Sequence, residues 1–262
     1  MASTISTFRF TSAALATAYV IHERAPDAAD GPGPWPAVLF MDGDDQFRFA
    51  VGAYEILRAR HRVGPLLLVG VGYGASYTKP GNRRLRDYTP TALPTEPGSG
   101  GADAFLAFLT GELWPELARR HRLREDVRGL GGHSLGSLLA LHALFQRRPF
   151  FNRILASAPS LFWDDRALLG AAGSLQRAGT ALPARLFLCV GENDTPSMTG
   201  DLKMLAAQLA AQPFPQLEVM TRRFAGRDHY NVLPDAFGAG LQTLFSGGPA
   251  RAARRQTLEP LI

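Results

Sequence analysis

The stretch "GLGGHSLGS" (Gly129–Ser137) places one serine, Ser134, in a G-x-S-x-G pattern, with Gly132 and Gly136 in the frame positions. A short apolar run leads into it, and a run of helical period, 135–145, follows at once. A serine at a sharp turn between a strand and a helix has its hydroxyl lifted clear of the sheet, and flanking glycines let the two arms of the turn approach closely. The pattern predicts a nucleophile elbow with Ser134 as the nucleophile. The alternative is a glycine-rich turn whose serine only caps the helix.

Short apolar runs alternate with longer segments of helical period along the rest of the chain. This is the pattern of βα units around a mostly parallel sheet, and the runs are mostly continuous, as expected for strands covered on both faces. The expected strands are 36–41, 65–71, 127–132, 153–158, 184–190 and 217–224, with an amphipathic strand at 16–24 before them. The expected helices are 47–62, 102–121, 135–148, 198–212 and 231–245, and Pro115 should kink or interrupt the second. The sequence therefore predicts an α/β fold with helices flanking a central, mostly parallel sheet.

The 262 residues contain no internal repeat and no linker that would divide the chain, so we expect a single α/β domain over 1–262 with a peripheral tail at 247–262. The segment 72–100 is rich in glycine, proline and threonine and shows no periodicity. A loop of that length in a compact domain is usually functional or mobile. Little chain lies between the elbow and strand 184–190, so we expect little or no lid domain. Loop 72–100 and segment 160–165 should then cover the site.

The charges, the hydropathy and the single cysteine argue against nucleic acid, a membrane span and an internal disulfide. The net charge of +5 comes from 28 basic and 23 acidic residues, and the basic clusters, "NRRLRDY" (Asn82–Tyr88) and "RAARR" (Arg251–Arg255), accompany no nucleic-acid motif. No stretch approaches the ~18 apolar residues of a membrane span, so neither nucleic acid nor membrane is an expected partner. With Cys189 alone, no internal disulfide can form. Because the first residues resemble a signal peptide only weakly, we expect a cytoplasmic location rather than a periplasmic or secreted one.

A serine nucleophile needs a base that accepts its proton and an acid that orients the base. Downstream of Ser134 there are two histidines, His142 and His229. His142 lies in the helix expected after the elbow, where it packs or is exposed. His229, in "GRDHYNVLP" (Gly226–Pro234), follows the last strand and precedes the last helix, where a loop can bring an imidazole over the elbow. His229 is the predicted base, unless it is only a surface-loop histidine, and His133 beside the serine is expected to point away from the site.

The acid should follow the strand expected at 184–190, where the sequence is "GENDTPS" (Gly191–Ser197). Asp194 and Glu192 both qualify, and Asp194 is favoured because it lies deeper in the loop. Asp228 is a third choice, since it adjoins His229 and would tend to point the opposite way. A carboxylate left over from this choice is more simply a helix cap or a solvated charge.

An oxyanion hole needs two backbone N–H groups. One comes from the residue after the nucleophile, Leu135, and the other from the loop after an earlier strand. The loop in "LFMDGDDQF" (Leu39–Phe47) suits this role, with Gly43 allowing the turn and the main chain of Asp44 as the donor.

These motifs, in this order, resemble those of the putative esterase family of α/β-hydrolases. The resemblance is strongest over 38–245 and rests on "MDGDDQF", "VGVGYG", "RRLRDYTPT", "GGADAFLAFL", "GGHSLGSLLALHAL", "SAPSLFWDD", "LFLCVGENDTP" and "GRDHYNVLP". The family includes enterobactin-type siderophore esterases, esterase D (S-formylglutathione hydrolase), feruloyl esterases and the antigen 85 mycolyltransferases.

The resemblance implies the α/β-hydrolase fold and a serine hydrolase that needs no cofactor and no metal. Carried over position by position, it implies Ser134 as nucleophile, His229 as base and Asp194 as acid. It also implies main-chain oxyanion donors at Asp44 and Leu135.

The resemblance is nearest to the siderophore-esterase branch, through "RDYTPT" and "APSLFWDD". That branch holds acidic ligands with arginines near the site, which implies Arg86 and also Arg83 or Arg84 as substrate-binding residues. They would suit an anionic or catecholate ester through charge-assisted hydrogen bonds. The alternative is a solvated cluster, or one paired with Asp87.

Phe162 and Trp163, in "APSLFWDD" (Ala158–Asp165), could form an apolar wall for an acyl or aryl group, or could instead be buried under the long loop. This segment departs from the "SPSLWW" of the branch, since Ala158 replaces a serine and Phe162 a tryptophan. A second departure is Tyr230, which follows the loop histidine where a small residue is more usual.

The leading hypothesis from the sequence is a serine carboxylesterase that forms an acyl-enzyme intermediate with a small-molecule ester. The most specific form of this hypothesis is an esterase that cleaves a siderophore trilactone. The alternatives are an acyltransferase or thioesterase on the same triad, resembling S-formylglutathione hydrolase, and a catalytically silent ligand-binding protein on a hydrolase frame. The sequence does not indicate the oligomeric state.

Overall fold

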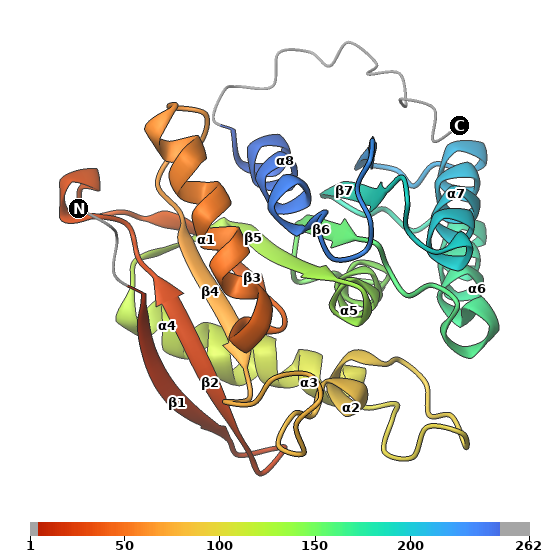
Figure 1. The fold of residues 1–262 in the computed structure, drawn as a ribbon, viewed down its shortest axis with the longest axis horizontal. Helices are drawn as coiled ribbons and strands as arrows, with labels where there is room; N and C mark the ends of the chain where they lie inside the picture. The colour runs from red at the N-terminus through yellow and green to blue at the C-terminus, as the bar shows by residue number, and fades with distance from the viewer. Residues whose placement is uncertain (1–4, 247–262) are drawn as a thin grey trace.

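The computed structural model describes residues 5–246 (Figure 1). Within this range, eight strands form one sheet in the order β1-β2-β4-β3-β5-β6-β7-β8. The β1–β2 and β2–β4 pairs are antiparallel and the other neighbouring strands are parallel, so the predicted mostly parallel sheet is confirmed. The strands are β1 Ser6–Ser12, β2 Thr17–Arg24, β3 Trp35–Phe40, β4 Leu67–Gly72, β5 Leu123–His133, β6 Arg153–Ser157, β7 Ala184–Gly191 and β8 Leu217–Phe224.

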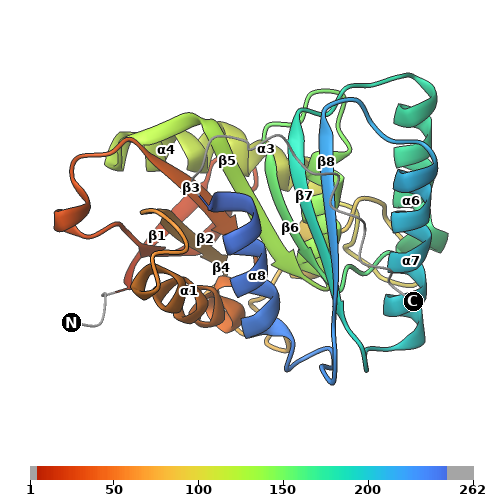
Figure 2. The ribbon, with the colours of Figure 1, turned by 90° about the horizontal axis from the view of Figure 1, so that it is seen from above.

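Helices cover both faces of the sheet (Figure 2). They are α1 Gly43–Ala59, α2 Arg84–Tyr88, α3 Ala102–Phe108, α4 Trp114–Arg120, α5 Leu135–Leu144, α6 Trp163–Arg177, α7 Pro196–Ala211 and α8 Leu233–Phe245. Helices α1 and α8 pack together in one apolar cluster on one face, and buried side chains of α2 to α7 belong to the cluster on the other face. The sheet is therefore the middle of three layers.

Strand β3 illustrates why the predicted strands are continuous apolar runs. Val38 and Phe40 belong to the cluster under α1 and α8, whereas Ala37 and Leu39 belong to the opposite cluster. Successive side chains of a strand point to opposite faces, so a strand covered on both faces needs an apolar residue at every position.

Pro115 interrupts a helix, as predicted. Helix α3 passes into a π turn at Leu109–Leu113, and α4 starts again at Trp114. A proline has no backbone N–H and tolerates only the first turn of a helix, where no intrahelical partner is needed. The run expected as one helix over 102–121 is therefore three consecutive pieces.

Three elements were missing from the sequence-based expectation. Strand β1 is an edge strand whose Phe8 and Phe10 pack against the core at alternate positions. Helix α2 lies inside the segment 72–100, which was expected to be a loop. Helix α6 buries Leu168, Ala172 and Gln176 at a spacing of four, but its first turn is polar and one of these three residues is a glutamine, so the apolar pattern in the sequence was incomplete.

Among the described residues, no helix has the length and hydropathy that a bilayer span would require. The tail at 247–262, including the cluster Arg251–Arg255, lies outside the described residues, so its peripheral role and the single-domain organisation stay predictions.

Candidate active site

Ser134 sits at a sharp turn between β5 and α5, with φ 58° and ψ −120°. Two glycines make that turn possible. A Cβ on Gly132 would lie 2.4 Å from the carbonyl carbon of Gly136, and a Cβ on Gly136 would lie 3.0 Å from the Cβ of Met41. The strand and the helix therefore approach more closely than side chains would allow, and the serine is left at the apex in a strained conformation.

Hydrogen bonds to β6 hold the turn in place. The backbone N–H of Ser134 donates to the carbonyl of Ser157 over 3.0 Å. The hydroxyl of Ser137, one turn into α5, lies 2.7 Å from the carbonyl oxygens of both Gly132 and Ser157. The strain at Ser134 is therefore supported by its surroundings.

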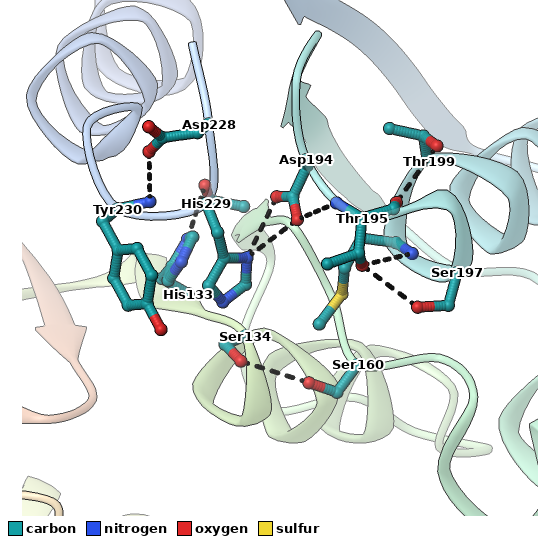
Figure 3. Close-up of polar contacts among 12 residues, drawn as sticks. His133, Ser134, Ser160, Asp194, Thr195, Ser197, Thr199, Asp228, His229 and Tyr230 are labelled. Atoms are coloured by element: carbon teal, nitrogen blue, oxygen red, sulfur yellow. Dashed lines mark hydrogen bonds and ion pairs between the residues drawn. The ribbon is translucent and has the colours of Figure 1, made fainter.

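His229 and Asp194 reach the elbow from two different loops (Figure 3). His229, between β8 and α8, places Nδ1 2.9 Å from Oδ2 and 3.1 Å from Oδ1 of Asp194. The Asp194 side chain is fully buried, and its Oδ1 also accepts the N–H of Thr195 over 2.7 Å. The other side of the His229 ring faces Ser134 in the close-up. The structure thus brings together the three residues predicted as nucleophile, base and acid.

The hydroxyl of Ser134 lies 3.3 Å from Oγ of Ser160, which is 1% exposed. The backbone N–H of Ser160 also donates to the carbonyl of Ser134 over 3.3 Å. The sequence analysis gave "APSLFWDD" as a cover for the site and a source of apolar wall residues, but it assigned no role to Ser160, so the contact of Ser160 with Ser134 was not predicted. In hydrolases without substrate, the hydrogen bond between base and nucleophile is often long and shortens when substrate binds.

The other carboxylates considered as the acid support loops. Glu192 accepts the N–H of Gly226 over 2.8 Å and lies 3.2 Å from Arg223. Asp228 accepts the N–H groups of Tyr230 and Asn231, each over 2.9 Å. Neither side chain contacts the His229 ring in any described hydrogen bond.

The two remaining histidines near the elbow have different surroundings. The Nε2 atom of His142 lies 2.7 Å from Oδ1 of Asp103, at hydrogen-bond distance. His133 was expected to point away from the site, and this is wrong. Its ring lies 4.4 Å from the ring of His229, and its Nδ1 lies 3.0 Å from Oγ of Ser157. Burial lowers the pKa of His133 to about 3, and the nearby His229 and Arg84 act in the same direction.

The predicted oxyanion donors occupy equivalent places in the fold. Leu135 is the first residue of α5 and Asp44 the second residue of α1, so neither N–H has a partner within its helix. These helices follow β5 and β3, which are neighbours in the sheet. Two helix N-termini, each with a positive partial charge, therefore lie side by side at the elbow.

Two of the three arginines predicted to bind substrate form ion pairs with carboxylates. Arg84 places Nε 2.8 Å from Oδ1 and Nη2 3.0 Å from Oδ2 of Asp42, a fully buried side chain. Burial raises the pKa of Asp42, and the Arg84 guanidinium opposes that rise. Arg86 bonds Asp87 over 2.6 Å and is 3.2 Å from the hydroxyl of Tyr19. The Asp87-paired alternative therefore holds for Arg86, whereas Arg83 is exposed and has no ion pair among residues 5–246.

The two aromatic residues predicted to form an apolar wall, Phe162 and Trp163, lie in different surroundings. Trp163 is buried beneath the long loop, and its Nε1–H points at Thr91, 3.1 Å from Oγ1 and 3.2 Å from the carbonyl oxygen. Phe162 is 45% exposed and lies two residues beyond Ser160. Trp163 therefore stabilises the loop, and Phe162 is the member of the pair that solvent and ligands can reach.

Within the described part of the chain, no three histidine, cysteine or acidic side chains are grouped so that they could hold a metal ion.

Comparisons with known proteins give a consistent result. The family described as "Putative esterase" matches residues 12–230. The ferri-bacillibactin esterase BesA of Bacillus subtilis is 28% identical over 251 residues, covering 88% of this chain and 86% of BesA. The siderophore triacetylfusarinine C esterase of Aspergillus fumigatus is 37% identical over 148 residues, but the match covers 55% of this chain and only 50% of that enzyme. Among solved structures, the BES protein from Bacillus cereus superposes with a TM-score of 0.84 and 26% identity, over 94% of this chain and 96% of that one.

Proposed function

Because the chain belongs to the "Putative esterase" family, we propose that it is a serine carboxylesterase that cleaves its ester through an acyl-enzyme intermediate on Ser134. The observation that best supports this proposal is the approach of three distant segments to one point. The strained elbow presents Ser134, and a second loop presents His229, whose Nδ1 is 2.9 Å from the buried carboxylate of Asp194 in a third.

In this mechanism His229 accepts the hydroxyl proton of Ser134 as Oγ attacks the ester carbonyl carbon. Asp194 accepts the hydrogen bond from Nδ1–H and stabilises the imidazolium that forms. The N–H groups of Asp44 and Leu135 donate to the oxyanion of the tetrahedral intermediate. The intermediate collapses as His229 returns the proton to the leaving alcohol, and a water molecule then repeats the sequence on the acyl-enzyme.

For the substrate we propose a siderophore ester, with a trilactone as the specific candidate. The names of the Bacillus subtilis and Aspergillus fumigatus relatives support this class. The charge near the elbow also supports it, since Arg84 uses Nε and Nη2 on Asp42 and leaves Nη1 without a partner among residues 5–246. Arg83, one residue before Arg84, is exposed, and Phe162 supplies an accessible ring. An anionic or catecholate ester suits these groups, and a cytoplasmic location would suit the hydrolysis of an imported siderophore.

The test of the mechanism is Ser134→Ala with hydrolysis of p-nitrophenyl butyrate and mass spectrometry after fluorophosphonate treatment. We expect loss of turnover and of the adduct, with the fold retained by circular dichroism. Ser174→Ala, on the outer helix α6, is the control and should keep both. Hydrolysis or labelling that survives Ser134→Ala would overturn the mechanism.

The substrate class is tested separately by comparing kcat/KM for a catecholate trilactone with that for p-nitrophenyl butyrate. A preference for the trilactone supports the siderophore assignment. A preference for the simple ester would remove that assignment and leave the serine mechanism in place.

A further inference from the structure

The side chain of Asp44 is fastened to the end of β4. Its Oδ2 accepts the backbone N–H groups of Tyr73, Gly74 and Ala75 over 2.5, 3.0 and 3.4 Å. Its Oδ1 lies 3.2 Å from Nε2 of His22, on β2. One carboxylate therefore joins the first turn of α1 to two other strands of the sheet.

Glycines make room for this arrangement. A Cβ on Gly72 would lie 2.5 Å from Oδ2 of Asp44, and a Cβ on Gly43 would lie 2.8 Å from the carbonyl carbon of Gly70. A side chain at Gly72 or at Gly43 would therefore collide with these atoms. The start of α1 is thus pressed against β4, with the carboxylate filling the space that Gly72 leaves.

The carboxylate is held in its charged form. Burial alone would raise the pKa of Asp44, but hydrogen bonds from His22 and from the N–H groups of Tyr73 and Ala75 outweigh burial and leave the pKa below its ordinary value. Hydrogen bonds to an ionised acceptor are stronger than those between neutral groups. The side chain is therefore a firm anchor for the backbone that carries it.

We propose that the Asp44 side chain is a positioning residue for its own backbone N–H, which it holds in the orientation needed to bind the oxyanion. The inference rests on the proposed function, because that function assigns the N–H as a donor. Oxyanion stabilisation needs donors within about 2.7–3.1 Å of the developing charge, so a small rotation of the first turn of α1 would weaken it. The carboxylate prevents that rotation without touching the substrate.

A matched control is available in α3. Asp103 is also the second residue of its helix, and its carboxylate also faces a histidine, at 2.7 Å from His142. Asp103→Ala removes a negative charge from a helix N-terminus, as Asp44→Ala does, but the Asp103 side chain is 82% exposed and contacts His142, eight residues beyond Ser134. It therefore reports the general effect of losing such a carboxylate.

The test measures kcat/KM for p-nitrophenyl acetate and the inhibition constant of a trifluoromethyl ketone, whose hemiketal oxygen occupies the oxyanion position. For Asp44→Ala we expect kcat/KM to fall about 10- to 100-fold, less than the ~10²–10³ lost when a donor is removed altogether, and the inhibition constant to rise by the same factor. Asp103→Ala should change neither quantity by more than about threefold. A structural defect alone would lower the melting temperature without making the two kinetic changes equal.

Two further variants keep the proposal testable if Asp44→Ala does not fold. Asp44→Asn keeps an acceptor oxygen but loses the charge, so its kcat/KM should fall less than that of Asp44→Ala, whereas Asp44→Glu keeps the charge but displaces the anchor and should lose about 10-fold or more. Equal losses in Asp44→Ala and Asp103→Ala, or an unchanged inhibition constant in Asp44→Ala and Asp44→Glu, would overturn the proposal. Failure of the proposed function would instead appear as hydrolysis that survives Ser134→Ala.

Discussion

The imidazole of His133 packs against that of His229, with 4.4 Å between ring centroids and 48° between ring planes. His133 is the residue directly before the elbow serine, and His229 is its predicted base. Burial, with the nearby His229 and Arg84, lowers the pKa of His133 to about 3. The ring next to the predicted base is therefore neutral at ordinary pH and adds no positive charge to the site.

This relationship predicts an acid-sensitive fold. The pKa of about 3 in the folded state lies below the 6.5 of an unperturbed histidine, so between these values the unfolded chain binds more protons. The contribution of His133 to stability is complete above about pH 6.5 and is lost as the pH falls, by about 2 kcal/mol at pH 5. Urea unfolding at pH 7 and pH 5 should show that His133→Gln removes roughly this difference.

The control is His61→Gln, at an exposed turn residue, which should leave the pH dependence as in the wild type. An unchanged slope in His133→Gln would show that the histidine is not kept neutral by its surroundings.

The acid is tested by exchanging each candidate for its amide. Asp194→Asn should lower kcat by about 10³–10⁴, because the amide cannot hold the imidazole in the productive tautomer. Glu192→Gln should lower it by less than about threefold, since Glu192 only bonds Gly226 and Arg223. Steady-state kinetics on one ester decides between them, and the opposite ranking would assign the acid to Glu192.

The buried pair of Arg84 and Asp42 predicts a large effect on stability. Arg84→Met leaves a fully buried carboxylate without its partner, so the free energy of unfolding should fall by about 3–5 kcal/mol. Arg83→Met, one residue earlier and exposed, should change it by less than about 0.5 kcal/mol. Urea titration measures both, and similar values for the two variants would mean that the pair contributes little.

We expect changes at Phe162 to affect substrate selectivity and changes at Trp163 to affect the stability of the fold. Phe162→Ala should raise KM for an aromatic acyl ester about 2- to 10-fold, the equivalent of about 0.5–1.5 kcal/mol of ring contact, and leave a short alkyl ester unaffected. Trp163→Phe should lower the free energy of unfolding by about 1 kcal/mol, since the hydrogen bond to Thr91 is lost, with no change in selectivity. A selectivity change in Trp163→Phe alone would reverse these assignments.

Much of the fold was predictable because its signals are local. The strands that became β3 to β8 are short apolar runs, and their ends agree with the structure to within a few residues. Strand β1 was not predicted because only one of its seven residues is fully buried, and helix α6 was not predicted because its first turn is polar and a glutamine is among its buried residues. The break at Pro115 was foreseen from the chemistry of a single residue.

The contacts of the arginines predicted to bind substrate were harder to predict, because whether a guanidinium forms an ion pair depends on which residue the fold places opposite it. Arg84 faces Asp42 across the fold, at a separation of 42 residues along the chain. Arg86 faces its own neighbour Asp87, which the sequence could indicate only as an alternative. No local pattern distinguishes these two from Arg83.

By itself, the sequence determined the strand, sharp turn and helix around Ser134 and the mostly parallel sheet that carries them, because hydrophobic period and glycine placement act over a few neighbouring residues. The tertiary structure decided that Asp194 rather than Glu192 meets His229, that His133 lies behind it, and that the Asp44 carboxylate reaches β4. Each of these contacts joins segments 29 or more residues apart. Their geometry depends on how the layers pack around the sheet, which no stretch of the chain encodes alone.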